Sequence, residues 1–346
     1  MSRLSSSSIP SVCFTIVIIS RLANISLAAF SSSAPSIFQP EMSLNVPSKV
    51  EGVDIELPNF DVLFDRIHQV SPLARAAMEG KEGGFANISD NNGRSALKWR
   101  VLESNKNRIV HQIEKIDNFQ GIGHPLLRFR SSLKGPCVPE LFARMIMDYD
   151  ARSQWDAQIA DVYEIYPALD LETVKRFIDG KKYGECSRLG IGYCQTKPNF
   201  VVSSREQLTL CGVQDFKDQG SSIIWGVEMP ETYDRFLPDP KDQGHVRAKS
   251  HLFSTTLIPT GPDSFDAEYV LQLEIGGAIP NFLTTPILQD TVKGLFHYAK
   301  DFFEKEESLY VDGAKVVDRH NKVKHADAKN ERKTLERVSS RGNYVE

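Results

Sequence analysis

The spacing of apolar positions predicts both helices and strands. In residues 60–70, FDVLFDRIHQV, apolar side chains recur every three or four positions, which predicts one amphipathic helix that Ser71 and Pro72 close. From Leu97 onwards, strand-like runs alternate with polar turns, so we expect the compact part of the chain to begin there. The expected strands cover residues 97–104, 107–116, 126–133, 161–166, 174–178, 183–191, 205–211, 221–228, 246–258 and 266–275.

Two further helices are predicted among and after these strands. Pro139 and Glu140 are residue types that favour a first helical turn, and apolar residues follow them at helical spacing up to Tyr149. A last amphipathic helix is expected over 287–304, with apolar residues at 288, 292, 295, 299, 302 and 303. Strand runs framed by helices predict an α+β fold with a mostly antiparallel sheet.

The composition of the N-terminus is typical of a targeting sequence. Residues 1–40 hold twelve serines and no acidic residue, and the short apolar run at 12–19 fits the core of a signal peptide. The junction Ala29-Phe30, followed by a serine-rich stretch, resembles the bipartite presequence of complex plastids. We therefore expect a presequence over 1–40 that directs the chain to a plastid, with the secretory pathway or a mitochondrion as alternatives.

Two other segments lie outside the expected domain. Residues 41–96 form an N-terminal extension that contains the first amphipathic helix. Residues 307–346 form a charged tail, in which nine Lys and Arg and six Asp and Glu fall within 311–346. Few apolar residues are available to order this tail, so we expect it to be disordered.

Charge and cysteine content exclude several classes of partner. A formal net charge of −4 gives no general attraction to nucleic acid, and no apolar run approaches the roughly 20 residues that span a bilayer. The five cysteines form no C-x-x-C pair and no Cys/His cluster with zinc-ligand spacing. We expect reduced thiols, no metal and no cofactor.

Four segments together resemble the START lipid-binding domain. In order, and near the family's spacing, they are MDYDARSQWDAQIADVYEI (147–165), VSSREQLTL (202–210), GHVRAKSHLFSTTLIPTG (244–261) and EYVLQLEIGGAIPNFL (268–283). The resemblance covers 97–306. It implies a helix-grip fold of the START and Bet v 1-like type, in which a curved antiparallel sheet surrounds a long C-terminal helix and encloses a tunnel for one lipid.

The resemblance also implies a set of lipid-binding positions. Several family members carry an arginine in the cavity where this chain has Cys211, which weakens the case for a phospholipid head group there. Gln207, Thr209 and Cys211 share strand parity and form a neutral, mildly polar wall if that parity faces the tunnel. The complete expected set is Arg205, Gln207, Thr209, Cys211, Arg247, Leu271 and Leu273.

A gate and a lid are implied next to this tunnel. The family's gate is a loop, here 193–201, together with the last helix, and Gly276 and Gly277 supply backbone freedom for a hinge between strand and lid. The expected gate and lid residues are Phe200, Val201, Gly276, Gly277, Leu288, Val292, Leu295, Ala299 and Phe302.

The resemblance favours binding and transfer of one lipid over catalysis. The ligand class stays open among sterol, phospholipid, galactolipid and similar lipids, and we expect a monomer that meets a membrane surface transiently. Two alternatives remain: a lipid-responsive regulator that does not transfer, and a helix-grip enzyme of the cyclase or hydrolase type. None of the eight histidines lies in a G-x-S-x-G or H-E-x-x-H motif, although His111 and His251 lie in expected strands and could face the cavity.

Overall fold

The computed structural model of the chain describes residues 38–46, 53–88, 97–134, 139–147, 149–166, 175–198, 202–236, 244–279 and 281–305. Most of the expected presequence, the expected tail and the gate residues Phe200 and Val201 lie outside these ranges. The side chain of Phe302 also lies outside what the structure describes.

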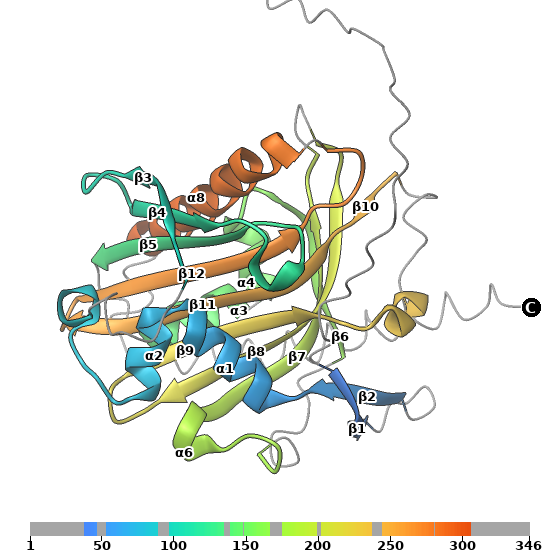
Figure 1. The fold of residues 1–346 in the computed structure, drawn as a ribbon, viewed down its shortest axis with the longest axis horizontal. Helices are drawn as coiled ribbons and strands as arrows, with labels where there is room; N and C mark the ends of the chain where they lie inside the picture. The colour runs from blue at the N-terminus through green and yellow to red at the C-terminus, as the bar shows by residue number, and fades with distance from the viewer. Residues whose placement is uncertain are drawn as a thin grey trace, which may run out of the picture. The chain divides into compact units, whose positions relative to one another are not determined.

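A curved, mainly antiparallel sheet forms the centre of the fold (Figure 1). Its strands lie in the order β3-β4-β5-β12-β11-β9-β8-β7-β6, and β10 pairs in parallel with β8. The strands are β3 (Arg100–Ser104), β4 (Val110–Ile116), β5 (Leu126–Lys134), β6 (Ile159–Tyr166), β7 (Glu185–Thr196), β8 (Arg205–Phe216), β9 (Ser221–Glu228), β10 (Val246–Arg247), β11 (Lys249–Gly261) and β12 (Ser264–Glu274). A separate hairpin pairs β1 (Phe38–Val46) with β2 (Val53–Pro58).

Helices pack on both faces of this sheet. Two of them, α1 and α2, lie across one face, in front in Figure 1, while α3 and α8 bury apolar residues against the other. The helices are α1 (Phe60–Val70), α2 (Pro72–Met78), α3 (Pro139–Met147), α4 (Tyr149–Trp155), α6 (Gly180–Tyr183) and α8 (Asn281–Lys305). Short 3-10 turns are η1 (Gly84–Asn87), η2 (Phe119–Gly121) and η3 (Glu231–Phe236).

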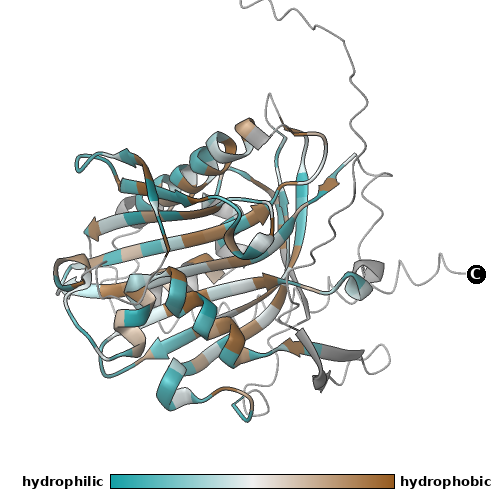
Figure 2. Ribbon diagram, in the orientation of Figure 1, coloured by the Kyte–Doolittle hydropathy of each residue, from teal (hydrophilic) through white to brown (hydrophobic). Residues whose placement is uncertain are grey.

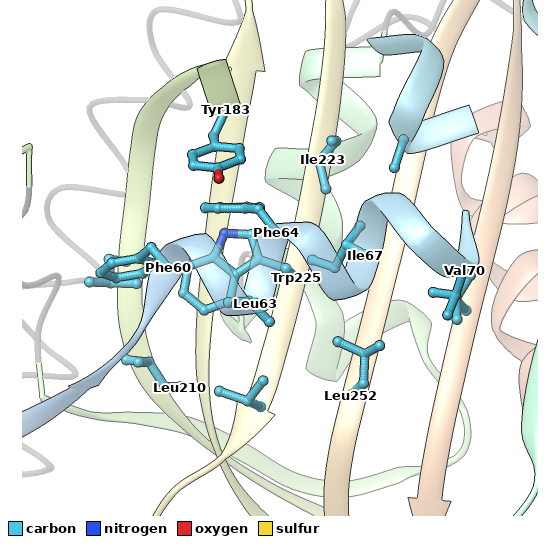
Figure 3. Packing of buried hydrophobic residues seen from close by; sticks show 14 of the residues in the cluster. Phe60, Leu63, Phe64, Ile67, Val70, Tyr183, Leu210, Ile223, Trp225 and Leu252 are labelled. Carbon is cyan, nitrogen blue, oxygen red and sulfur yellow. The ribbon is translucent and has the colours of Figure 1, made fainter. Parts of the chain in front are cut away.

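The face of the sheet that α1 and α2 cover, called the outer face from here on, packs against these helices in one hydrophobic core. Hydrophilic and hydrophobic residues alternate along α1 in Figure 2, as expected for a helix with one buried face. Phe60 and Phe64 meet Trp225 edge to face at 5.8 and 6.0 Å between ring centroids, and Phe64 stacks on Tyr183 at 4.6 Å (Figure 3). The compact part therefore begins with α1 and not, as expected, near Leu97.

Pro72 is the first residue of helix α2, whereas the sequence pattern predicted only that the helix over 60–70 ends there. Ser71 caps α2, because its Oγ accepts a hydrogen bond from the backbone N–H of Ala74 at 2.9 Å. A proline at the first helical position loses nothing, since that N–H has no partner inside the helix. Glu268 in β12 reinforces the start of α2 by accepting hydrogen bonds from Ser71 Oγ at 2.6 Å and from the N–H of Leu73 at 3.2 Å.

Three other expectations need correction. Residues 175–177 form a turn that leads into α6, capped by Asp179, and not a strand over 174–178. The helix after Pro139 gives way to a second helix, α4, which the pattern did not predict. The last helix starts at Asn281, six residues earlier than expected, and contains Pro286 at its sixth position, where the proline removes one backbone hydrogen bond.

Candidate functional site

A cavity of about 130 Å³ lies between the inner face of the sheet and helices α3, α4 and α8. Its wall is mainly apolar, with neutral polar groups from β7, β8 and β11. Among the positions expected from the sequence, the cavity is lined by Gln207, Thr209, Cys211, Leu271, Leu273, Leu288, Val292 and Leu295. The shared parity of the three β8 residues thus faces the cavity, while their contact with a ligand stays a prediction.

Two expected arginines do not line the cavity, and the structure gives each another role. Arg205 donates from Nε to the carbonyl of Ile275 at 2.9 Å, from Nη1 to the carbonyl of Ser203 at 2.6 Å, and from Nη2 to the carbonyl of Gly276 at 3.3 Å. Arg247 pairs through Nη2 with the fully buried carboxylate of Glu206 at 2.8 Å. Both guanidinium groups therefore fasten strand ends next to the hinge, Arg205 through backbone carbonyls and Arg247 through a buried carboxylate.

An ion pair at the cavity, with a buried carboxylate and a partly buried guanidinium, was missed from the sequence. Arg152 and Asp156, four residues apart at the end of α4, line the cavity with Nε and Oδ2 3.3 Å apart. Burial alone would lower the pKa of the Arg152 guanidinium, but the charge and hydrogen bond of the adjacent Asp156 carboxylate raise it, so Arg152 stays charged. A charged pair at this spacing usually lies on a solvated helix face, so only packing reveals its burial.

Two other ionisable groups of the wall, Cys194 and Tyr269, are held neutral. Burial raises the pKa of the Cys194 thiol to about 11 and that of the Tyr269 hydroxyl to about 12. Cys194, Cys186 and Cys211 are free thiols, among the cysteines that the structure describes. A neutral thiol is a poor nucleophile, so the cavity offers little for covalent chemistry at neutral pH.

Histidines likewise take structural positions. No histidine lines the cavity among the residues described; His111 packs edge-on against Phe85 at 5.6 Å, and His251 Nδ1 lies 3.0 Å from Glu228 Oε1. Within the same residues, no group of three His, Cys, Asp or Glu side chains is arranged to hold a metal ion. No described helix has the length and apolar character needed to cross a bilayer.

The hinge between β12 and α8 requires glycine at its first position. Gly276 and Gly277 have φ values of 71° and 73°, a region that other residues rarely adopt. A Cβ on Gly276 would also overlap the backbone carbonyl oxygen of Arg247, whereas one on Gly277 would find Arg205 Nη2 at 3.4 Å, an ordinary contact. Gly276 is therefore required both by its backbone conformation and by the lack of space for a Cβ, whereas Gly277 is required only by its backbone conformation.

Polar contacts help to hold α8 over the cavity. Lys293 Nζ lies 2.6 Å from Glu103 Oε2 in β3, and Gln158 Nε2 donates to the carbonyl of Thr291 at 3.0 Å. Gly294 leaves room for Gln158, whose side-chain nitrogen would lie 2.8 Å from an added Cβ. Apolar residues of α8, Leu288, Val292, Leu295 and Phe296, are buried on its inner side.

Comparisons with known proteins lead to lipid transfer proteins. No family model matches the chain. It is 23% identical to the phosphatidylcholine transfer protein of Bos taurus over 177 residues, covering 47% of the chain and 70% of that protein, and 23% identical to that of Rattus norvegicus over 172 residues with the same coverage. Among solved structures, human STARD10 is similar, with 15% sequence identity and a TM-score of 0.48. The match covers 77% of this chain and 85% of the STARD10 chain. Human StAR-related lipid transfer protein 5 follows at 14% identity, 61% and 89% coverage and a TM-score of 0.46.

The chain's own topology, a curved antiparallel sheet with a long C-terminal helix packed on its inner face, is that of a helix-grip α+β fold.

Proposed function

We propose that this chain, which has the helix-grip fold of START domains, binds one hydrophobic lipid in the cavity under α8 and transfers it between membranes. The observation that carries the proposal is an apolar-walled cavity closed by an amphipathic helix, which joins the sheet through a two-glycine hinge. The names of the matched relatives, phosphatidylcholine transfer proteins, support the same class of function.

The size of the cavity determines how a lipid could enter. About 130 Å³ is close to an engineered cavity that holds benzene and well below the roughly 300–1,000 Å³ of drug-sized ligand sites. A whole lipid therefore requires α8 to move away from the sheet. Because burial of each methylene contributes about 0.8 kcal/mol, a loaded lipid is held without a covalent bond and leaves most readily at a membrane.

Loading provides the direct test of binding. The purified full chain is incubated with liposomes of mixed lipids, separated from them, and examined by native mass spectrometry. We expect one lipid per chain. Cys211→Trp should abolish loading, because the indole fills the cavity beside β8, whereas Val101→Trp, at a position 54% exposed, should load normally. A folded wild-type chain that takes up no lipid would contradict the proposal.

Transfer is tested separately from binding. Movement of a fluorescent lipid from donor to acceptor vesicles should accelerate in the presence of the wild-type chain. Loading without acceleration would favour a lipid-responsive regulator that does not transfer, and would retain only the binding half of the proposal. Because no histidine lines the described cavity wall and the Cys194 thiol is protonated, we propose binding in preference to catalysis.

We also propose that the protein acts in a plastid, as a monomer with transient membrane contact. A fluorescent protein fused after residues 1–40 should enter plastids, because this segment has the serine-rich, acid-free composition of a presequence. Fluorescence in the secretory pathway or in mitochondria would contradict this location without affecting lipid binding.

A further inference from the structure

A β-bulge in β11 turns Ser250 towards the cavity. Ser250 pairs with Leu273 in β12, yet Leu252 pairs with Gln272, so β11 has one extra residue at this point. Directly paired residues point to the same face of a sheet, and Leu273 lines the cavity. Ser250 therefore faces the cavity, as does Phe253 beyond the bulge, whereas strict alternation would place Ser250 with Leu252 on the outer face.

The extra residue of the bulge, His251, is anchored through one ring nitrogen. His251 Nδ1 lies 3.0 Å from Glu228 Oε1 at the end of β9, and Nε2 lies 3.6 Å from Glu274 Oε2 at the end of β12. His124 stacks beside it at 6.3 Å between ring centroids. The bulge is therefore held by neighbouring strand ends, and the direction of Ser250 is part of the fold.

Ser250 is a buried polar side chain that needs a partner. The residue is 2% exposed, and its Oγ makes no hydrogen bond within the described part of the protein. A buried hydroxyl without a partner destabilises the protein. Since this hydroxyl belongs to a cavity-lining residue, a ligand in the cavity can supply the missing hydrogen bond.

The charges of the cavity wall indicate what kind of ligand group fits. Arg152 and Asp156 are the charged side chains of the described wall, and they compensate each other at 3.3 Å. An anionic head group would have to compete with Asp156 for the guanidinium. An ion pair that is already matched favours a ligand without net charge.

A quaternary ammonium group also fits this wall poorly. Such groups are recognised by several aromatic faces that surround the cation. Phe253 and Tyr269 stack, with ring planes 7° apart and centroids 6.4 Å apart, so one face of each ring is turned to the other. Tyr149, the third aromatic side chain of the wall, already has the Arg188 guanidinium over its ring at 5.9 Å. Gln207 and Cys194, which pair across β7 and β8, are neutral and not aromatic.

We propose that the head group bound in this cavity is uncharged and carries a hydroxyl that hydrogen-bonds to Ser250. The inference rests on the proposed lipid-binding function and narrows its ligand class. Diacylglycerols and sterols share this chemistry, whereas phosphatidylcholine and phosphatidic acid do not.

The first experiment measures selectivity. The full chain is incubated with vesicles that contain equal amounts of dioleoylphosphatidylcholine, dioleoylphosphatidic acid, dioleoylglycerol and cholesterol, and bound lipid is extracted and quantified by mass spectrometry. We expect dioleoylglycerol or cholesterol to be enriched about tenfold over either phospholipid, and the enriched lipid identifies the source of the hydroxyl. Equal or greater loading of a phospholipid would overturn the inference and leave lipid binding intact; a chain that loads none of the four would overturn both.

The second experiment tests Ser250 itself. Ser250→Ala should weaken binding of the enriched lipid, dioleoylglycerol or cholesterol, about fivefold and leave binding of its deoxy analogue unchanged, because that analogue has no oxygen to hydrogen-bond to Ser250. Ser250→Thr, which keeps a hydroxyl, should bind like the wild type. The matched control is Ser254→Ala, a buried serine of the same strand that pairs with Val270 and does not line the cavity. An unchanged affinity for the hydroxyl lipid in Ser250→Ala, or an equal loss in Ser254→Ala, contradicts the role of Ser250.

Discussion

Arg205 shows how one residue can follow a family pattern and still have a role other than the expected one. Its guanidinium reaches the carbonyls of Ser203, Ile275 and Gly276, so it ties the start of β8 to the hinge below α8. The neighbouring Glu206 is fully buried and accepts from Arg247 Nε at 3.0 Å and from the Tyr193 hydroxyl at 3.0 Å. At the residue scale, the conspicuous charged pair of the sequence therefore shapes the hinge and leaves the ligand wall neutral.

Arg205→Lys should destabilise the protein and impair loading. A single ammonium group cannot replace the planar fork that reaches three backbone carbonyls, so we expect the free energy of unfolding to fall by about 2–4 kcal/mol in urea titrations. The control is Arg100→Lys, where a guanidinium 64% exposed faces Asp117 at 3.4 Å, and the expected change is below about 0.5 kcal/mol. Equal stability of both variants would show that the hydrogen bonds of the Arg205 guanidinium do not contribute to the free energy of unfolding.

At the element scale, α8 combines a buried apolar side with polar contacts that can be broken. Leu288, Val292 and Leu295 line the cavity, while Lys293 contacts Glu103. The hydrogen bond and charge of Lys293 lower the pKa of the Glu103 carboxyl below its usual value. A lowered folded-state pKa means that this contact stabilises the protein above the carboxyl's unfolded pKa and is lost as the pH falls through the folded one.

We therefore expect α8 to loosen in acid. As the pH falls from about 5 to about 3, amide hydrogen exchange in α8 should become less protected in the wild type, whereas Glu103→Gln should show the lower protection already at the higher pH. Glu231→Gln is the matched control, because Lys249 likewise lowers the pKa of the Glu231 carboxyl, but in a pair on η3 and β11. If Glu231→Gln altered α8 as much as Glu103→Gln, the effect would be general and not due to this contact.

The hinge glycines give a second prediction at this scale. Gly276→Ala should lower stability by more than the roughly 1–2 kcal/mol of an unfavourable backbone conformation, because its Cβ also collides with Arg247, and it should slow lipid loading. Gly123→Ala is the control: its φ of 77° is similar, but nothing lies within 4 Å of the added Cβ. Chemical unfolding and the loading assay separate the two effects, and equal costs at both sites would argue against a steric requirement.

At the scale of the whole molecule, one sheet separates two cores. The outer core joins α1 and α2 to Trp225 and its neighbours, and the inner core joins α3 and α8 to the cavity side. Buried polar contacts join α2 to the sheet through β12, where Glu268 accepts hydrogen bonds from Ser71 Oγ and from Arg130 Nε at 2.9 Å. The N-terminal helices are thus part of the domain that forms the cavity.

A chain that starts at Leu97 should therefore fail to fold. It lacks the side chains of Phe60, Leu63, Phe64, Ile67 and Val70, each fully or almost fully buried. At about 1.5–3 kcal/mol each, their loss reaches roughly 8–15 kcal/mol, the whole stability of a typical domain. A chain that starts at residue 53 should give a cooperative thermal transition. A stable, monomeric chain from Leu97 would show that the outer core is dispensable.

The sequence by itself determined the class of fold and the main strands, because two-residue and helical periodicities record which side of each element is buried. It also indicated the neutral wall of Gln207, Thr209 and Cys211, since strand parity is a local property. It could not show that Arg205 fastens a hinge or that Arg152 and Asp156 pair inside the protein, because those contacts join residues whose spacing along the chain carries no signal of burial.

Only the tertiary structure decided the direction of Ser250. The bulge that turns it inwards exists because β11 has one residue more than its partner strand, and pairing between strands is not written in the periodicity of either one. The same holds for α1, whose amphipathic pattern predicted a buried side but not the sheet face that buries it. Local patterns indicate which side of a helix or strand is buried, whereas long-range packing determines which element buries it.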